Sequence, residues 1–349
     1  MEMSESGKPL ITFALFSYNQ EKYILDAVEA AFAQTYEPLE IVLSDDCSTD
    51  GTFELMQQAA ARYRGAHKVL VRQTAENLGT LRHVVNVASV ASGRLMVLAA
   101  GDDLSKCSRT SVLVDSWQAT GAWGLCSRFD VLDDQAKLLQ QSAAAEVTQG
   151  RYHDKFFHDA EGPVKIVLGS TSAYDARIFD FLVLSEDDFI LSEDSVLSVM
   201  LNVMGKKIIH LDDSLVLYRQ HAGSLTSGGS GRPLAYATIV SDEKKMEWFS
   251  RAEANALRFL LRIEEMVGRE KARSLRRQVI AEDLADLEVR GRWSEMTFLR
   301  RLTYLARNML PPRVNWALPR VFGPRPFFVL KWLYSRARSI PGRNPMAKP

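Results

Sequence analysis

Cysteine is scarce in this chain of 349 residues, which contains only Cys47, Cys107 and Cys126. Their spacing matches neither a metal-binding pair nor a disulfide framework, so we expect free thiols in a reducing cytosol. The sequence also lacks a basic and apolar leader, and no apolar run approaches the ~18 residues of a membrane-spanning helix. These absences predict a protein that is neither secreted nor integral to a membrane.

Several nucleotide- and metal-binding motifs are absent as well. No GxGxxG follows the first predicted strand, residues 10–16, which disfavours a dinucleotide-binding Rossmann site. No loop rich in glycine and lysine follows that strand, which disfavours a nucleotidyltransferase. The DxSxS metal-adhesion pattern fails at Asp50, which stands where its last serine is required.

What remains is an ordinary composition with an unusual distribution of charge. Apolar residues make up 46% of the chain and charged residues 25%, which is typical of a globular protein with a sizeable core. The net charge is zero, yet residues 290–349 hold 13 Lys or Arg and one acid, which leaves a net charge of −12 on the rest. We therefore expect an acidic body with a basic tail.

The tail, residues 311–349, alternates arginines with aromatic residues such as Trp316 and Trp332. This mixture suits an anionic membrane surface, where each cation gains about 1 kcal/mol. The alternative is a tail that packs on its own domain or on a second subunit. Nucleic acid is not expected as a partner, because nothing else in the acidic body is basic.

Short apolar runs alternate with helix-like segments over the first 120 residues. Such alternation predicts right-handed strand–helix–strand units and a mostly parallel sheet flanked by helices. The predicted strands are residues 10–16, 40–43, 68–72 and a strand starting at residue 95, and the predicted helices are residues 23–32, 53–63, 78–91 and 109–120.

Acidic residues follow two of these strands directly. The run LMVLAAGDDL delivers Asp102 and Asp103 to the end of its strand, and EIVLSDD does the same for Asp45. Ligands of α/β sheets bind beyond the carboxyl ends of strands, and two adjacent carboxylates there favour a divalent cation that carries phosphate oxygens. A carboxylate such as Asp45 can accept hydrogen bonds from a base or a ribose. Capping of the next helix explains residues 48–50 equally well.

The combination SYNQEKYILDAVEAAFAQTYEPLEIVLSDDCSTDGT, ENLGT and AAGDD resembles inverting GT-A glycosyltransferases of family 2. The resemblance covers about the first 110 residues. It implies a GT-A fold, a nucleotide-diphospho-sugar donor (UDP-sugars favoured) and Mg²⁺ or Mn²⁺. It places the donor against Phe16, Ser17, Asp45 and Asp102, and the metal on Asp103 with Asp102. Family members often carry an acid where this chain has Ala100, and Arg82 either faces the pyrophosphate or lies on a helix surface.

Two further elements match the family in the middle of the chain. In LSEDSVL, the resemblance makes Asp194 the general base that accepts a proton from the acceptor hydroxyl, with Glu193 as a structural or acceptor-orienting neighbour. Capping by Ser192, with two acids in the first helical turn, is the structural alternative. In LYRQH, Arg219 and His221 either bind donor phosphates or complete the metal shell, or His221 is an ordinary residue at a strand end.

We predict a GT-A domain over residues 8–230, a helical region over 231–310 and the tail. The loop at 222–232, rich in glycine and hydroxyl residues, is predicted to close over the donor. The segment GRW at 291–293 resembles part of the QxxRW box of processive synthases, but Gln is missing, which argues against such a synthase.

The predicted activity is metal-dependent, inverting transfer of a sugar to a hydroxyl acceptor, such as a glycan or a lipid-linked saccharide of the bacterial cell surface. The alternative is a nucleotide-sugar-binding protein without catalysis. The protein is predicted to lie in the cytoplasm and to bind peripherally to the inner face of the cytoplasmic membrane.

Overall fold

The computed structural model describes residues 7–143, 156–157, 165–167, 169–185, 188–221, 236–268 and 273–307. The predicted lid at 222–232 and the basic tail at 311–349 lie outside these residues. Strands and helices alternate through the first 120 residues, as predicted. The elements are β1 (Ile11–Ser17), α1 (Ile24–Phe32), β2 (Leu39–Asp45), α2 (Thr52–Arg62), β3 (Lys68–Gln73), α3 (Thr80–Ala88), β4 (Leu95–Ala100), β5 (Leu104–Ser105) and α4 (Arg109–Thr120).

The rest of the described chain completes the sheet and then becomes helical. Its elements are β6 (Gly124–Leu132), β7 (Leu138–Ala143), the 3-10 helix η3 (Gly169–Thr171), β8 (Ser172–Asp175), the 3-10 helix η4 (Ala176–Phe181), α5 (Glu193–Val203), β9 (Ile208–Arg219), α6 (Tyr236–Val267), α7 (Arg277–Arg290), the 3-10 helix η5 (Trp293–Glu295) and α8 (Phe298–Arg307).

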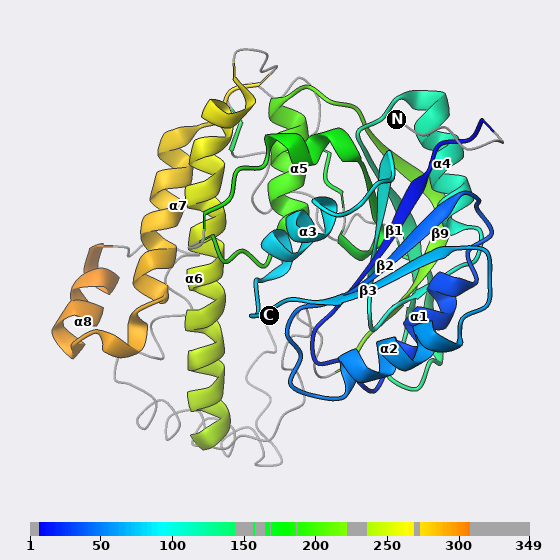
Figure 1. Cartoon of the computed structure of the whole chain (residues 1–349). Coiled ribbons are helices and arrows are strands. Elements are labelled where there is room, and N and C mark those ends of the chain that lie inside the picture. The colour runs from blue at the N-terminus through cyan, green and yellow to red at the C-terminus, as the bar shows by residue number, and fades with distance from the viewer. Residues whose placement is uncertain are drawn as a thin grey trace, which may run out of the picture. The chain divides into compact units, whose positions relative to one another are not determined.

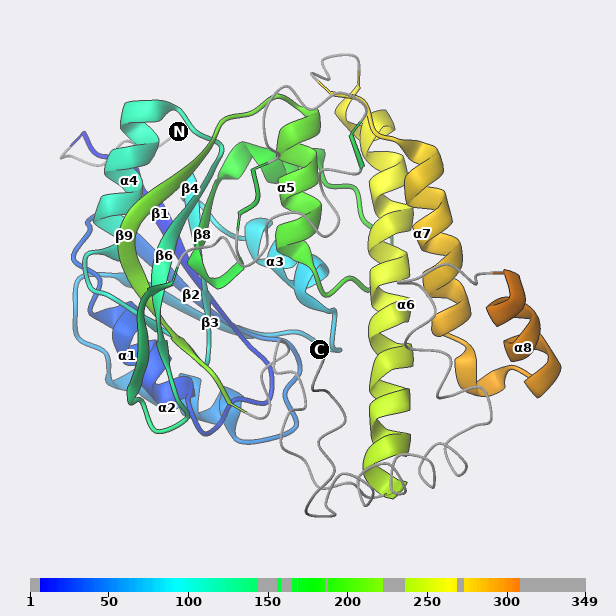
Figure 2. The ribbon, with the colours of Figure 1, turned by 180° about the vertical axis from the view of Figure 1, so that it is seen from behind.

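The strands form one mixed sheet in the order β3-β2-β1-β4-β8-β6-β9-β5, with β7 paired to β6. The four strands β3, β2, β1 and β4 are mutually parallel, whereas β8 joins β4 and β6 in antiparallel fashion. Helices α1, α2 and α4 lie on one side of the sheet, and α3 and α5 lie on the other (Figures 1 and 2). This arrangement matches the predicted fold class.

One strand prediction needs correction. The apolar pattern of residues 207–211 and 215–219 predicts two separate strands, but β9 runs from Ile208 to Arg219 without a break. Asp212 and Asp213 interrupt the apolar pattern, yet pairing with β6 continues past them, with a register shift between Cys126 and Arg128. The exposed Asp212 is tied to Arg128 of β6 by an ion pair of 2.9 Å.

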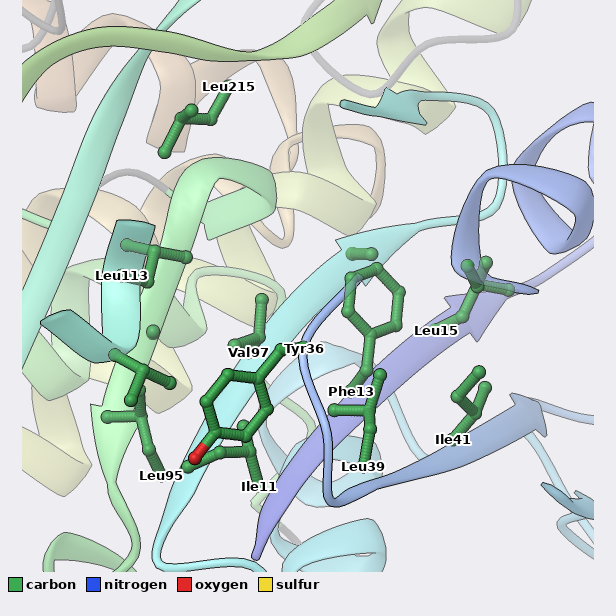
Figure 3. Packing of buried hydrophobic residues seen from close by; sticks show 14 of the residues in the cluster. Ile11, Phe13, Leu15, Tyr36, Leu39, Ile41, Leu95, Val97, Leu113 and Leu215 are labelled. Atoms are coloured by element: carbon green, nitrogen blue, oxygen red, sulfur yellow. The ribbon is translucent and has the colours of Figure 1, made fainter. Parts of the chain in front are cut away.

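The main core lies between the sheet and helices α1, α2 and α4. Alternate residues of β1 (Ile11, Phe13 and Leu15) point into it and are at most 1% exposed (Figure 3). Tyr36 closes one edge of this core, and its hydroxyl donates to the carbonyl of Pro9 at 2.8 Å. Burial of this apolar surface stabilises the fold by about 25 cal/mol per Å² and so holds together the sheet whose strand ends carry the site.

The chain divides into two compact units. The first contains the sheet and takes in residues 255–283, the second half of α6 and part of α7, in addition to residues 1–227. The second contains residues 228–254 and 284–349, and Trp293 is buried at its centre against Met246, Val289 and Tyr304. Among the described residues, no helix is both long and apolar enough to cross a bilayer.

Candidate active site

The predicted acids come together because β2, β1 and β4 are parallel neighbours. Ser17, the last residue of β1, pairs with Asp45, the last residue of β2. On the other side, Phe16 of β1 pairs with Ala100, where β4 ends just before Asp102. One edge of the sheet therefore carries both predicted acidic motifs (Figure 2).

Asp45 is fully buried, and both of its carboxylate oxygens accept hydrogen bonds from the protein. Ser17 Oγ donates to it at 3.2 Å, the backbone N–H of Ser48 at 2.8 Å and Gln73 Nε2 at 2.9 Å, and the Ser48 hydroxyl donates as well. These bonds join β1, β3 and the loop before α2 at the strand ends. In that loop Asp50 accepts the N–H of Thr52, the first residue of α2, at 3.0 Å, although the N-cap position itself is taken by Gly51.

Asp46, the neighbouring acid, was not predicted to have a role. It is 4% exposed and accepts the backbone N–H groups of Leu78 and Gly79 at 2.9 and 3.1 Å, together with the Thr74 hydroxyl at 3.1 Å. Burial raises its pKa. Its partners lie about 30 residues away, so no local signal in the sequence reveals them. Asp46 thus fixes the turn of the ENLGT segment to the end of β2.

A neutral histidine forms the wall beside Phe16. His83 of α3 is 3% exposed, and burial, with Arg72 nearby, lowers its pKa to about 4. Its Nε2 lies 2.7 Å from Ser44 Oγ, and its ring meets Phe16 edge to face at 5.0 Å. Its neighbour Arg82 is half-buried on the same helix.

The corner after β4 brings three predicted residues together. Gly101 lets this corner lie close to Gln20, because a Cβ on it would be only 2.4 Å from Gln20 Oε1. Asp103 is 5% exposed, and its Oδ1 accepts the backbone N–H of Arg219 at 2.8 Å. Burial and the charge of Asp102 raise the pKa of Asp103 to about 8.

The predicted Tyr-Arg-x-His element closes this corner. His221 Nε2 lies 3.0 Å from Asp102 Oδ2, and the Arg219 guanidinium donates to the backbone carbonyl of Asp102 at 3.0 Å. The same guanidinium pairs with Asp26 of α1 at 3.1 Å and stacks on Tyr23. Arg219 is therefore buried and engaged by the protein.

Arg109 was predicted only as part of a helix, but it is a fully buried cation behind the acids. Its guanidinium donates to the carbonyls of Leu98 and Ser170 at 2.7 and 2.8 Å, which ties β4 to η3. Burial lowers its pKa to about 9, and the nearby Asp103 opposes that shift.

The corner has the chemistry that a hard divalent cation requires. Asp103 Oδ2 is buried and has no hydrogen-bond partner, and Asp102 adds a second carboxylate beside it. Carboxylate oxygens are the ligands that Mg²⁺ and Mn²⁺ prefer, and the remaining positions go to water and phosphate. Within the described residues no three His, Cys, Asp or Glu side chains form a metal cluster. The protein could thus supply only part of the coordination shell.

The predicted base lies at the start of α5. Asp194 accepts the backbone N–H of Ser195 at 2.7 Å and that of Gly169 at 3.4 Å, and burial raises its pKa. Burial and the charge of Asp194 raise the pKa of Glu193 to about 7. A Cβ on Gly169 would lie 2.8 Å from Glu193 Oε1. Ser192 occupies the capping position but makes no capping bond through its side chain.

Part of the chain matches known sequences. Residues 12–183 match the family described as "Glycosyl transferase family 2". The chain is 41% identical to uncharacterized protein Rv1520 of Mycobacterium tuberculosis over 88 residues, 25% of each chain. It is 33% identical to TuaG of Bacillus subtilis, a putative teichuronic acid biosynthesis glycosyltransferase, over 28% of this chain and 37% of TuaG. These matches span about a quarter to a third of the relatives' length.

Among solved structures, S. aureus TarS 1–349 in complex with UDP-GlcNAc has a TM-score of 0.51 and 16% identity to this chain. The alignment covers 89% of this chain and 80% of the TarS chain. At this level of identity the likeness concerns the fold alone, and it confirms the predicted GT-A fold.

Proposed function

Residues 12–183 belong to glycosyl transferase family 2, and on that premise we propose that the protein transfers a sugar from a nucleotide-diphospho-sugar to a hydroxyl acceptor, with inversion at the anomeric carbon. The observation that carries this proposal is the corner at Asp102 and Asp103, where a buried carboxylate oxygen has no partner beside the ends of parallel strands. Ligands of such sheets bind at this edge.

The nucleoside and the diphosphate of the donor bind at different points along this edge of the sheet. Phe16 and Ser17 lie against the nucleoside, and Asp102 reaches the ribose or the metal shell. Asp45 binds the base by exchanging one of its present hydrogen bonds, because its carboxylate is fully buried and both oxygens already accept bonds from the protein.

Asp103 and Asp102 would hold Mg²⁺ or Mn²⁺, which when bound would offset the charge on the departing diphosphate. His221, predicted as a third ligand, does not form a metal cluster with these two acids and instead contacts Asp102. Arg219, predicted to contact the donor phosphates, is buried and paired with Asp26, so its role at this corner is to hold Asp102 and Asp103 in place. UDP-sugars are the first donors to test, because TarS, which shares the fold, was solved with UDP-GlcNAc.

Asp194 acts as the general base. The acceptor oxygen attacks the anomeric carbon from the face opposite the diphosphate, and the bond from that carbon to the diphosphate oxygen breaks. The hydroxyl proton passes to Asp194, whose pKa is raised by burial, which makes its carboxylate a stronger proton acceptor than an exposed one. Glu193 orients the acceptor beside it.

The acceptor is a glycan or a lipid-linked saccharide of the bacterial cell surface, a class that the name of TuaG supports. A lipid-linked acceptor lies at the cytoplasmic face of the membrane, which the basic tail is proposed to bind. In flotation with anionic vesicles, full-length protein in which Arg313, Arg320 and Arg325 are replaced by Gln should bind less than the unchanged chain. Equal binding would remove the membrane proposal.

The direct test measures release of nucleoside diphosphate from UDP-, GDP- and dTDP-sugars, with Mg²⁺, Mn²⁺ or EDTA. Turnover should require metal and should be lost in Asp103→Ala. Asp194→Asn should lower kcat by about 100-fold or more, in line with loss of a general base, while UDP affinity measured by calorimetry stays unchanged. Asp212→Asn, which alters an exposed carboxylate of the same sheet, is the matched control.

Two outcomes would contradict the proposal. Unchanged turnover in Asp194→Asn would remove that residue as the base. Nucleotide binding without turnover on any donor would favour the alternative of a binding protein, which the alanine at position 100, in place of an acid, specifically supports.

A further inference from the structure

The three residues that lead into α5 are each tethered to another element. Asp188, Phe189 and Ile190 form this segment, which we name the 188–190 segment, and α5 begins three residues later at Glu193. Only Leu191 and Ser192 separate the segment from the first turn of α5, where the proposed base is located. The contacts that hold it come from α6 and α3.

The strongest contact is an ion pair with α6. Arg262 Nη2 donates to both oxygens of Asp188, at 2.6 and 2.7 Å. Asp188 is 6% exposed and also accepts the N–H and hydroxyl of Ser185 at 2.7 and 2.9 Å. Burial acts to raise the pKa of Asp188, but Arg262 and the Ser185 donors outweigh it and hold this pKa below its usual range. Asp188 is therefore ionised at neutral pH and available to pair with Arg262.

A second contact from the same helix holds the next residue. Asn255 Nδ2 donates to the carbonyl of Phe189 at 3.2 Å. Asn255 and Arg262 are seven residues apart, so they lie on one face of α6, two turns from each other. Both belong to the compact unit that contains the sheet.

The third contact comes from α3, on the donor side. The carbonyl of Ile190 accepts the backbone N–H of Leu81 at 3.1 Å and the Thr80 hydroxyl at 3.2 Å. Leu81 and Thr80 follow the turn that Asp46 fixes to β2. The segment is thus held between α6 and the turn of the ENLGT segment (residues 76–80), which we name the donor-side turn.

We propose that Arg262 is a positioning residue for the transfer reaction: by holding Asp188, it fixes the segment that carries Glu193 and Asp194. This inference rests on the proposed function. On this proposal the C-terminal part of α6, which carries Asn255 and Arg262, contributes to catalysis, although no motif in the sequence of that helix indicates such a role. A base must lie within about 3 Å of the proton it accepts, and a misplacement of about 1 Å can lower the rate on the order of 100-fold.

The experiment compares full-length Arg262→Met, Arg262→Lys and Asp188→Asn with the unchanged protein. Methionine keeps an apolar stem against Phe259, over which the Arg262 guanidinium lies at 5.2 Å, and removes the ion pair. Arg251→Met is the matched control, because Arg251 is on the same helix but pairs with the exposed Glu295 of the second unit. The readouts are kcat, donor KM, UDP affinity by calorimetry and hydrogen exchange of the amides at residues 191–196.

We expect Arg262→Met to lower kcat by about 10- to 100-fold, while donor KM and UDP affinity stay within about twofold. Amide exchange at the start of α5 should become faster. Arg262→Lys should restore part of kcat, and the double variant Asp188→Asn/Arg262→Met should be no slower than either single one, because both remove the same contact. Arg251→Met should match the unchanged protein.

Different results overturn different statements. If the unchanged protein has no turnover, the proposed function fails, and the positioning role fails with it. If the unchanged protein is active and Arg262→Met has the same kcat and the same exchange at 191–196, only the positioning role fails. A parallel loss of kcat and UDP affinity in both Arg262 variants would show general loss of structure and would also refute it.

Discussion

Replacing Gly79 by alanine tests the contact between the donor-side turn and the 188–190 segment. Gly79 has φ 73° and ψ 163°, a conformation that is essentially restricted to glycine and costs other residues about 1–3 kcal/mol. An added Cβ would also lie 3.1 Å from the ring of Phe189 and 3.2 Å from the carbonyl of Ile190. Crowding of this kind costs about 1–3 kcal/mol.

The chain contains a matched control for the backbone contribution. Gly121 ends α4 with φ 63° and ψ 24°, and nothing lies within 4 Å of the Cβ that alanine would add. Gly121→Ala should therefore destabilise the fold by about 1 kcal/mol, from its left-handed backbone alone. After allowance for the entropy that alanine removes from the unfolded chain, Gly79→Ala should cost about 3 kcal/mol.

The assay is thermal and urea unfolding of both full-length variants, followed by turnover. A loss of about 3 kcal/mol corresponds to a fall in Tm of roughly 6 °C for a domain of this size. Turnover should fall in Gly79→Ala and not in Gly121→Ala, because only the former displaces Ile190. If Gly79→Ala were no less stable than Gly121→Ala, the close packing of this turn on the 188–190 segment would be refuted.

Two further predictions concern single residues near the site. In the folded protein the pKa of Glu193 is about 7, above its ordinary value of 4.5. Between these two pH values the folded protein keeps a proton on Glu193 that the unfolded chain releases. The stability of the fold therefore decreases as the pH rises from 4.5 to 7. Glu193→Gln should accordingly raise Tm at pH 8 and leave it unchanged at pH 4, and a higher Tm at both pH values would contradict this cause. Cys47 has φ 62°, which costs a residue with a side chain about 1 kcal/mol, so Cys47→Gly should be more stable by up to ~1 kcal/mol in urea unfolding. A loss of stability would instead show that the Cys47 thiol contact with the carbonyl of Ala75, at 3.7 Å, matters more than the backbone.

Much of the fold could be predicted because its signals are local. A strand of alternating or continuous apolar residues ends where polar residues begin, and a helix repeats every 3.6 residues. These patterns predicted β1 to β4 and the helices between them, and they placed Asp45, Asp102 and Asp103 at strand ends. Parallel neighbours then brought these ends to one edge of the sheet. The short strand β8 escaped prediction because its four residues are all buried and show no period.

What only the tertiary structure decided is which distant residues meet. Asp103 accepts the N–H of Arg219 from 116 residues away, Asp46 holds a turn 32 residues away, and Arg262 reaches Asp188 across 74 residues. Such partners depend on strand order and helix packing, which follow from the burial of the whole core rather than from any window of sequence. The sequence by itself determined which side chains are the candidates for the chemistry. The packing of α3 and α6 on the segment before α5 decided how firmly the proposed base is held, because contacts between residues this far apart form only when the whole chain folds.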